Sequence, residues 1–269
     1  MNEFADRRCI KLHAAEDFAG MRAAGRLAAA ALDMITAQVR EGVTTAELDR
    51  LCHEFVRDHG GTPASLGYRG YAHATCISLN HVVCHGIPGE RRLMEGDILN
   101  IDLAVVLDGW HGDSSRMYGV GRVGTRAARL MDVAYEAMMR GIAAIRPGAT
   151  IGDIGFVIQR YVEEARFNVV RDFCGHGLGR VYHDAPDVLN YGRPGEGPEL
   201  RPGMFLTVEP MVNAGRPDVK ILGDGWTAVT RDRSLSAQFE HSVGVTETGC
   251  EIFTLSPARL TKPPYPIAG

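Results

Sequence analysis

The sequence predicts an α+β fold made of two related halves. Helix-favouring stretches alternate with segments rich in β-branched residues, which are typical of strands. Two pairs of segments also repeat in the same order along the chain: residues 39–48 resemble 145–154, and residues 93–102 resemble 200–209. The offsets of 106 and 107 residues are nearly equal, which favours a duplicated unit over chance matches.

The first half begins with an alanine-rich stretch, and Gly42 marks the turn before a second helix. The dipeptide Asp108-Gly109 is a strong signal for a two-residue hairpin turn. Its expected helices are 17–37 and 45–59, and its expected strands are 74–84, 97–107 and 110–120. In the second half, helices are expected at 125–145 and 151–166, and strands at 204–213, 226–231 and 238–246.

We expect the two halves to share one core. The helices of each unit can cover only one face of its sheet, so the two units are expected to pack against each other. Residues 1–269 would then form a single catalytic domain, with pseudo-repeats at about 17–120 and 125–250. The proline-rich tail, 257–269, is expected to be a solvated surface segment.

Composition excludes several classes of function. The net charge is −4, and the sequence has no long run of one sign. The chain therefore shows no basic segment of the kind that binds nucleic acid or an anionic membrane. No apolar stretch approaches the roughly 20 residues of a membrane helix, and no secretory signal is recognisable. The six cysteines form no Cys-x-x-Cys pair, which favours reduced thiols and a cytoplasmic location.

Two acids occupy matching places in the repeat. Asp102 lies in the apolar segment NIDLAVV, and Glu209 lies in its counterpart FLTVEPM. A buried charge is costly unless it is paired or binds a metal. Each acid alone could instead face solvent on an alternating strand, but the shared position in both halves weakens that alternative.

The predicted hairpin brings in a third acid, Asp113. With a turn at Asp108-Gly109, Asp102 faces Ser115, and Asp113 is its diagonal neighbour on the same face. Glu240 holds the corresponding late-strand place in the second half. Four carboxylates this close would repel each other strongly, and two divalent cations would neutralise their formal charge of −4.

Two histidines complete the expected site. His176 lies between glycines and can supply a nitrogen ligand; without thiolates, this set suits Mn, Fe, Co or Zn in a catalytic site. His183 and His85 share the pattern His-x-x-Pro, so a symmetric repeat would place them on opposite sides of the substrate. A surface or core position is the default for any single histidine, and it is kept for the others.

Five motifs resemble those of methionine aminopeptidases, in the order found in that family. They are VCHGIPG (83–89), NIDLAVVLDGWHGDSSRMY (100–118), CGHGLGRVYHDAP (174–186), LTVEPM (206–211) and SAQFEH (236–241). The resemblance spans about residues 10–255 and is closest to the short type I form. It implies the pita-bread fold, a curved antiparallel sheet covered by helices, with halves related by a pseudo-twofold axis.

The resemblance also assigns roles to residues. It implies a dinuclear metal centre held by Asp102, Asp113, His176, Glu209 and Glu240, and it places His85 and His183 beside the substrate. It implies a methionine pocket formed by Tyr68, Tyr71, Cys76, Phe173, Tyr182 and Trp226. It further implies a monovalent cation (Na or K) near Asn80, Val82 and Ser236. Ser65, Arg69 and Tyr182 depart from the family's common residues, which affects the shape of the pocket.

The activity implied is removal of the N-terminal methionine from nascent chains and peptides with a small second residue. A metal-bridged hydroxide would attack, Glu209 would accept its proton, and His183 would donate to the carbonyl oxygen. We expect a monomer that meets its substrates at the ribosome. The alternatives are an X-Pro dipeptidase or aminopeptidase P, and a non-catalytic binding protein of the same fold, which would be expected to lack some of the ligands.

Overall fold

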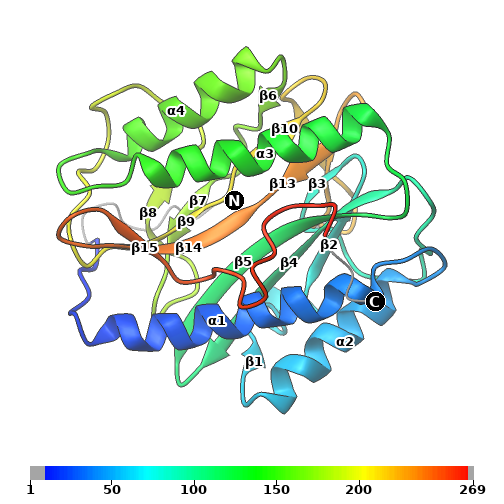
Figure 1. The fold of residues 1–269 in the computed structure, drawn as a ribbon, viewed down its shortest axis with the longest axis horizontal. Coiled ribbons are helices and arrows are strands. Elements are labelled where there is room, and N and C mark those ends of the chain that lie inside the picture. Colours follow the sequence, from blue (N-terminus) through cyan, green and yellow to red (C-terminus); the bar gives the residue numbers. More distant parts are fainter. Residues whose placement is uncertain (1–9, 266–269) are drawn as a thin grey trace.

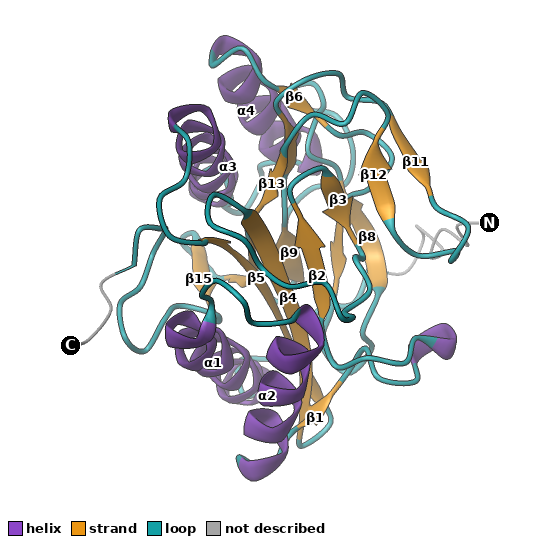
Figure 2. Ribbon diagram, turned by 90° about the vertical axis from the view of Figure 1, so that its right-hand side faces the viewer, coloured by secondary structure: helices purple, strands orange, loops and turns teal. Residues whose placement is uncertain are grey.

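The computed structural model describes residues 10–265 (Figure 1). A large antiparallel sheet runs through the middle of the molecule, and four helices lie on one face of it (Figure 2). Short strands and loops lie on the opposite side in this view. The helices are α1 (Asp17–Ile35), α2 (Thr45–Asp58), α3 (Thr125–Ala143) and α4 (Ile151–Glu164), with short 3₁₀ turns η1 (Thr36–Gln38) and η2 (Tyr68–Gly70).

The large sheet has nine strands in the order β1-β4-β5-β14-β9-β7-β8, with β2 beside β4 and β15 beside β14. Its members are β1 (Thr62–Pro63), β2 (Cys76–Leu79), β4 (Ile98–Leu107), β5 (Trp110–Gly119), β7 (Gly175–Gly177), β8 (Asp184–Val188), β9 (Phe205–Val208), β14 (Glu240–Val245) and β15 (Cys250–Ile252). Two small sheets contain β3 (Val82–Cys84), β6 (Asn168–Val169), β10 (Met211–Asn213), β11 (Val219–Ile221), β12 (Ala228–Thr230) and β13 (Ser236–Gln238).

The hairpin expected in the first half is confirmed. Strands β4 and β5 pair along their whole length, from Ile98 opposite Gly119 to Leu107 opposite Trp110. Asp108 and Gly109 both have positive φ, 50° and 78°, as a two-residue type I′ turn requires. The turn therefore sets the register of every residue in both strands.

The repeat is visible as matching backbone contacts. Thr44 forms an isolated antiparallel bridge with Arg92, and Thr150 forms one with Glu199. Thr44 and Thr150 are also the N-caps of α2 and α4, and each side chain accepts a hydrogen bond from a backbone N–H of the first helical turn. In both halves, therefore, the N-terminus of the second helix contacts the segment that precedes a central strand, β4 in the first half and β9 in the second.

Each helix pair covers its own apolar cluster on the sheet. Leu32 of α1 and Leu48 of α2 form one cluster with Leu99, Ile101 and Leu103 of β4, and all five side chains are fully buried. In the second half, Ile154 and Ile158 of α4 belong to a cluster with Val208, Phe239 and Val243. Burial of each such side chain contributes about 1.5–3 kcal/mol, so the amphipathic helices fix the sheet from one side and leave its other face for the site.

Several expected strands are shorter or interrupted. The stretch 74–84 is two strands, β2 and β3, because the chain turns at Asn80, which has φ 53°. The stretch 204–213 is also two strands, since Pro210 lacks the N–H that would continue the ladder. The stretch 226–231 is paired only as β12, and Gln238 of the expected 238–246 belongs to β13, on another sheet. The first helix ends at Ile35, and one 3₁₀ turn follows it.

The C-terminal tail is partly anchored. Most of residues 257–265 are exposed or half-buried, but the Tyr265 hydroxyl donates to the Met117 carbonyl at 3.0 Å, and its ring contacts that of Tyr118. Residues 266–269 of the expected tail lie outside the described residues. Within 10–265, no helix combines the length and apolar character needed to cross a membrane.

Candidate metal centre

A row of facing residues crosses four strands of the large sheet. Cys76 on β2 pairs with Asp102 on β4, Asp102 pairs with Ser115 on β5, and Ser115 pairs with Glu240 on β14. Directly paired residues share a face of the sheet, and so does Asp113, two residues from Ser115. The pairing therefore gathers acids from both halves on the face opposite the helices.

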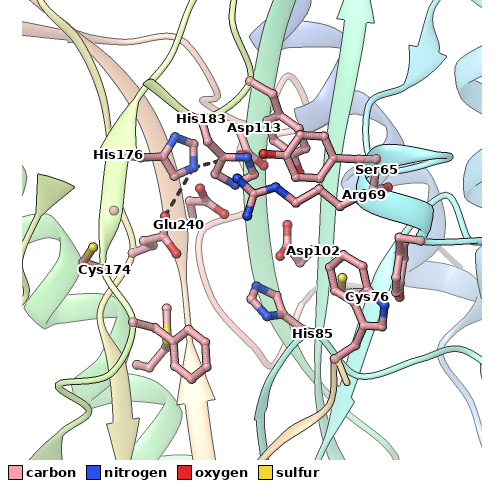
Figure 3. Close-up of a pocket in the computed structure, with 18 of the residues that line it drawn as sticks. Ser65, Arg69, Cys76, His85, Asp102, Asp113, Cys174, His176, His183 and Glu240 are labelled. Atoms are coloured by element: carbon pink, nitrogen blue, oxygen red, sulfur yellow. Dashed lines mark ion pairs between the residues drawn. The ribbon is translucent and has the colours of Figure 1, made fainter. Parts of the chain in front are cut away.

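His176 on β7 faces these acids. Its Nε2 atom lies 3.5 Å from Oδ2 of Asp113 and 3.7 Å from Oε1 of Glu209. Potential ligand atoms of Asp113, His176 and Glu240 all lie within 4.8 Å of one another. Asp102 and Glu209 line the same cavity, so all five residues expected as ligands are brought together. Figure 3 labels four of them: Asp102, Asp113, His176 and Glu240.

Hydrogen bonds fix the orientation of His176 and Glu209. Nδ1 of His176 lies 3.0 Å from the Gly177 carbonyl, which requires the proton on Nδ1 and directs Nε2 to the acids. The His176 amide donates to Thr207 Oγ1, and that hydroxyl donates to Glu209 Oε1 at 2.8 Å. Gln238 Nε2 donates to the other Glu209 oxygen at 3.2 Å.

The glycines around His176 are required by close approach of the backbone. A Cβ atom at Gly175 would lie 2.4 Å from the Thr207 carbonyl oxygen, and one at Gly177 would lie 2.0 Å from that of Ala185. Any side chain there would push β7 away from its neighbours. The glycines therefore let a short strand bring His176 close to the acids.

The electrostatics of the cluster fit bound cations. Burial, and then the charges of Asp113 and Glu209, raise the pKa of Asp102 and of Glu240 well above the usual values. Burial also raises the pKa of Glu209 to about 7. Oδ1 of Asp113 is buried without a hydrogen-bond partner among the described residues. Repelling carboxylates, a buried oxygen that lacks a donor and one imidazole form a donor set suited to divalent ions.

The acids open onto a cavity of about 290 Å³. In Figure 3, His183 lies above and His85 below the carboxylates of Glu240 and Asp102. Burial lowers the pKa of His85, and burial together with the charge of His176 lowers the pKa of His183 to about 2. Both imidazoles are therefore neutral and can each donate or accept one hydrogen bond.

Aromatic rings form much of the cavity wall. Tyr71 contacts Trp226 at 4.9 Å between ring centroids, and His85 contacts Phe173 at 5.4 Å. Burial raises the pKa of the Cys76 thiol, which stays protonated and acts as a small apolar group. All six residues expected in the substrate pocket line this cavity: Tyr68, Tyr71, Cys76, Phe173, Tyr182 and Trp226.

Sequence reasoning missed several participants. Thr207 and Gln238, which hold Glu209, lie two residues before Glu209 and Glu240 in motifs already singled out. The alternation of side chains along a strand could have placed them on the same face as the acids. Met211 also lines the cavity, and it follows the strand break at Pro210, which the expected strand 204–213 had ignored.

The three residues expected around a monovalent cation lie outside the cavity lining. The Asn80 carbonyl accepts a hydrogen bond from the Ser236 amide at 2.8 Å, so these two residues are neighbours. Val82 begins β3, two residues further along. The Asn80 side chain donates to Asp97 at 2.8 Å, which holds the turn between β2 and β3.

Four carboxylates and one histidine gathered in a cavity are typical of metal-dependent hydrolases. The chain belongs to metallopeptidase family M24, whose family model matches residues 19–247. It is 58% identical over 257 residues to a methionine aminopeptidase of Rickettsia prowazekii, covering 95% of this chain and 99% of that protein.

Solved structures agree with this assignment. The crystal structure of the methionine aminopeptidase from Rickettsia prowazekii matches with a TM-score of 0.91 at 57% identity, over 92% of this chain and 100% of that chain. An Xaa-Pro dipeptidase from Bacillus anthracis shares the fold, with a TM-score of 0.73 at 24% identity, over 91% of this chain and 62% of that chain. The α+β pita-bread fold expected from the sequence is confirmed.

Proposed function

We propose that the chain removes N-terminal methionine from peptides and proteins whose second residue is small. The observation that carries this proposal is the convergence of four acids and one histidine from both halves in a cavity lined by aromatic rings. The similarity to methionine aminopeptidases over nearly the whole chain supports it.

We propose that Asp102, Asp113, His176, Glu209 and Glu240 hold two divalent ions, which would be Mn, Fe, Co or Zn. Bound ions of this kind lower the pKa of water toward neutrality and polarise a carbonyl. The raised pKa values of the acids and the unpartnered Asp113 oxygen support the binding of positive charge between them.

Glu209 is the proposed proton acceptor. Its Oε1 lies 3.7 Å from Nε2 of His176, so Glu209 would lie beside the bound ions and could take a proton from the attacking water and pass it to the leaving amine. Thr207 and Gln238 each donate to one oxygen of Glu209, so the carboxylate keeps one orientation through both transfers.

The two neutral histidines are proposed to contact the substrate. His183 would donate to the scissile carbonyl oxygen as negative charge develops there, a contribution of about 2.7–4 kcal/mol by analogy with other oxyanion donors. His85, at the opposite end, packs against Phe173 and Trp226. A methionine thioether suits this second end, because sulfur packs well against aromatic rings and against Cys76.

We further propose that residues 1–269 act as one catalytic domain and as a monomer. The substrates would be the N-termini of nascent chains, met at the ribosome in the cytoplasm. A Na or K ion near Asn80, Val82 and Ser236 would brace the turn that follows β2; the left-handed backbone at Asn80 and its contact with Ser236 support this.

Hydrolysis of Met-Ala-Ser and of an X-Pro dipeptide, each with and without a chelator, tests the proposed reaction. We expect release of methionine from Met-Ala-Ser, loss of that activity with chelator and recovery with added metal. Cleavage of the X-Pro dipeptide alone would instead favour the dipeptidase alternative. Chelator-insensitive cleavage, or none with any metal, would contradict the proposal.

A further inference from the structure

One cation in the cavity wall has no part in the proposed reaction. Arg69 of η2 lines the cavity beside Tyr68. No ion pair joins its guanidinium to an acid within 10–265, whereas Arg50 of α2 and Arg160 of α4 are each paired with an acid of their own helix. A cation at a substrate cavity that forms no ion pair with the described residues can act on charges of the ligand.

The position of Arg69 is set by its backbone and by one ring. Its φ is 49°, a left-handed conformation that residues other than glycine adopt only uncommonly. The guanidinium carbon lies 5.4 Å from the centre of the Tyr68 ring, and that ring lies 5.1 Å from the ring of His183. Figure 3 shows the side chain extended across the cavity toward His183 and away from His85.

The proposed reaction indicates which part of the substrate would lie near Arg69. The methionine side chain would occupy the end near Trp226 and Phe173, and the scissile carbonyl would face His183. The residues that follow methionine would then leave past His183 and Tyr68, beneath Arg69. Because the second residue is small, the third is the first whose side chain could reach the guanidinium.

We propose that Arg69 binds a carboxylate on the substrate just after the cleaved bond, and so favours peptides with an acidic third residue or a nearby free C-terminus. This inference rests on the proposed function. Guanidinium–carboxylate hydrogen bonds are stronger than neutral ones and can be bidentate. Asp172 and Asp187 also line the cavity and would repel a substrate carboxylate. The preference for an acidic group is therefore limited to carboxylates that lie beside Arg69.

The test compares kcat/KM for a set of amidated peptides that differ at the third residue. They are Met-Ala-Asp-NH2, Met-Ala-Asn-NH2 and Met-Ala-Lys-NH2, with Met-Ala-Asn bearing a free C-terminus as the second source of a carboxylate. We expect kcat/KM for Asp to exceed that for Asn by about threefold to fivefold, with Lys below Asn, as for a partly exposed charge pair. The ratio should shrink at 0.5 M salt, where screening is strong.

Variants assign the preference to Arg69. Arg69→Gln is expected to bring the Asp-to-Asn ratio close to one, and Arg69→Glu to invert the order of Asp and Lys. Arg160→Gln makes the same charge change on α4, outside the cavity lining, and should keep the wild-type ratios. If only the free C-terminus responds to Arg69, then the carboxylate source is the end of a short peptide.

Two outcomes overturn the inference, and they differ. Equal kcat/KM for all four peptides, or ratios that Arg69→Gln leaves unchanged, would reject the role of Arg69 while the proposed function stands. Release of methionine from none of them by the metal-loaded wild type would reject the proposed function and this inference with it.

Discussion

The two halves of the sheet place their acids by different means. In the first half, Asp102 and Asp113 lie within one continuous hairpin, whose two-residue turn fixes their register. In the second half, β9 and β14 pair only from Phe205 to Val208, and Glu209 lies just beyond the last pair. The connection between these strands carries Met211 and Trp226, which line the cavity.

This difference shows how one duplicated unit can serve two purposes. The tight hairpin is a rigid half of the proposed metal centre. The long connection in the other half forms the wall that would contact substrate, and Glu209 is held there by Thr207 and Gln238 instead of by a ladder. The halves also differ in the layer under the helices: Arg116 of β5 is buried against Asp33 of α1, whereas Val243 of β14 belongs to the apolar cluster of the second half.

Loss of one acid from each half should have the largest effect. Asp113→Asn and Glu240→Gln each remove a charge from the proposed metal centre, where bound ions contribute several kcal/mol to the reaction, so kcat/KM for Met-Ala-Ser should fall at least about a thousandfold. Asp58→Asn and Glu163→Gln make matched changes on exposed helix surfaces of the two halves and should retain activity. A small loss in only one half would break the equivalence.

The buried ion pair of the first half should have the next largest effect. Arg116 donates to Asp33, which also accepts from Ser256 and from the Ala258 amide. Asp33→Ala leaves the Arg116 charge buried and unpaired, so chemical denaturation should show a loss of about 3–5 kcal/mol in the free energy of unfolding.

A double variant tests whether apolar side chains, as found under the helices of the second half, can replace the buried ion pair of the first half. Asp33→Ala with Arg116→Val removes both charges and leaves apolar side chains at both positions, so it should recover much of the loss. If the double variant is less stable than Asp33→Ala alone, the buried charge of Arg116 is not the source of the cost.

Metal-free protein should respond to pH through the acids shared by both halves. The pKa of Glu209 is raised to about 7 in the folded state, so folded protein holds a proton that the unfolded chain releases near pH 4.5. The free energy of unfolding should therefore fall by the order of 3 kcal/mol as pH rises from about 4.5 to above 7. Thermal unfolding of chelated protein measures this, and saturating metal should abolish the fall by stabilising the ionised acids.

The smallest effect tests the repeat itself. Gly42 and Gly148 have φ of 84° and 82° in equivalent turns, and a Cβ would meet nothing within 4 Å at either. Gly42→Ala and Gly148→Ala should each cost about 1 kcal/mol, because only the left-handed backbone opposes the methyl group. Unequal losses in chemical denaturation would show that the two turns are no longer equivalent.

Much of the site was predictable where local rules act. The turn at Asp108-Gly109 set the facing of Asp102 and Ser115, and the repeat pointed to Glu209 without any contact being known. The interruptions at Asn80 and Pro210 were missed, because both lie inside runs of strand-favouring residues. The short strand around His176 was missed for the opposite reason, since its glycines disfavour any regular element until the packing of β8 and β9 is known.

Anomalous diffraction from crystals grown with manganese or cobalt tests the central claim most directly. If the two halves converge on a dinuclear centre, two peaks should lie among Asp102, Asp113, His176, Glu209 and Glu240, each peak contacted by residues of both halves. A single peak bound by one half alone, or peaks away from these residues, would contradict it.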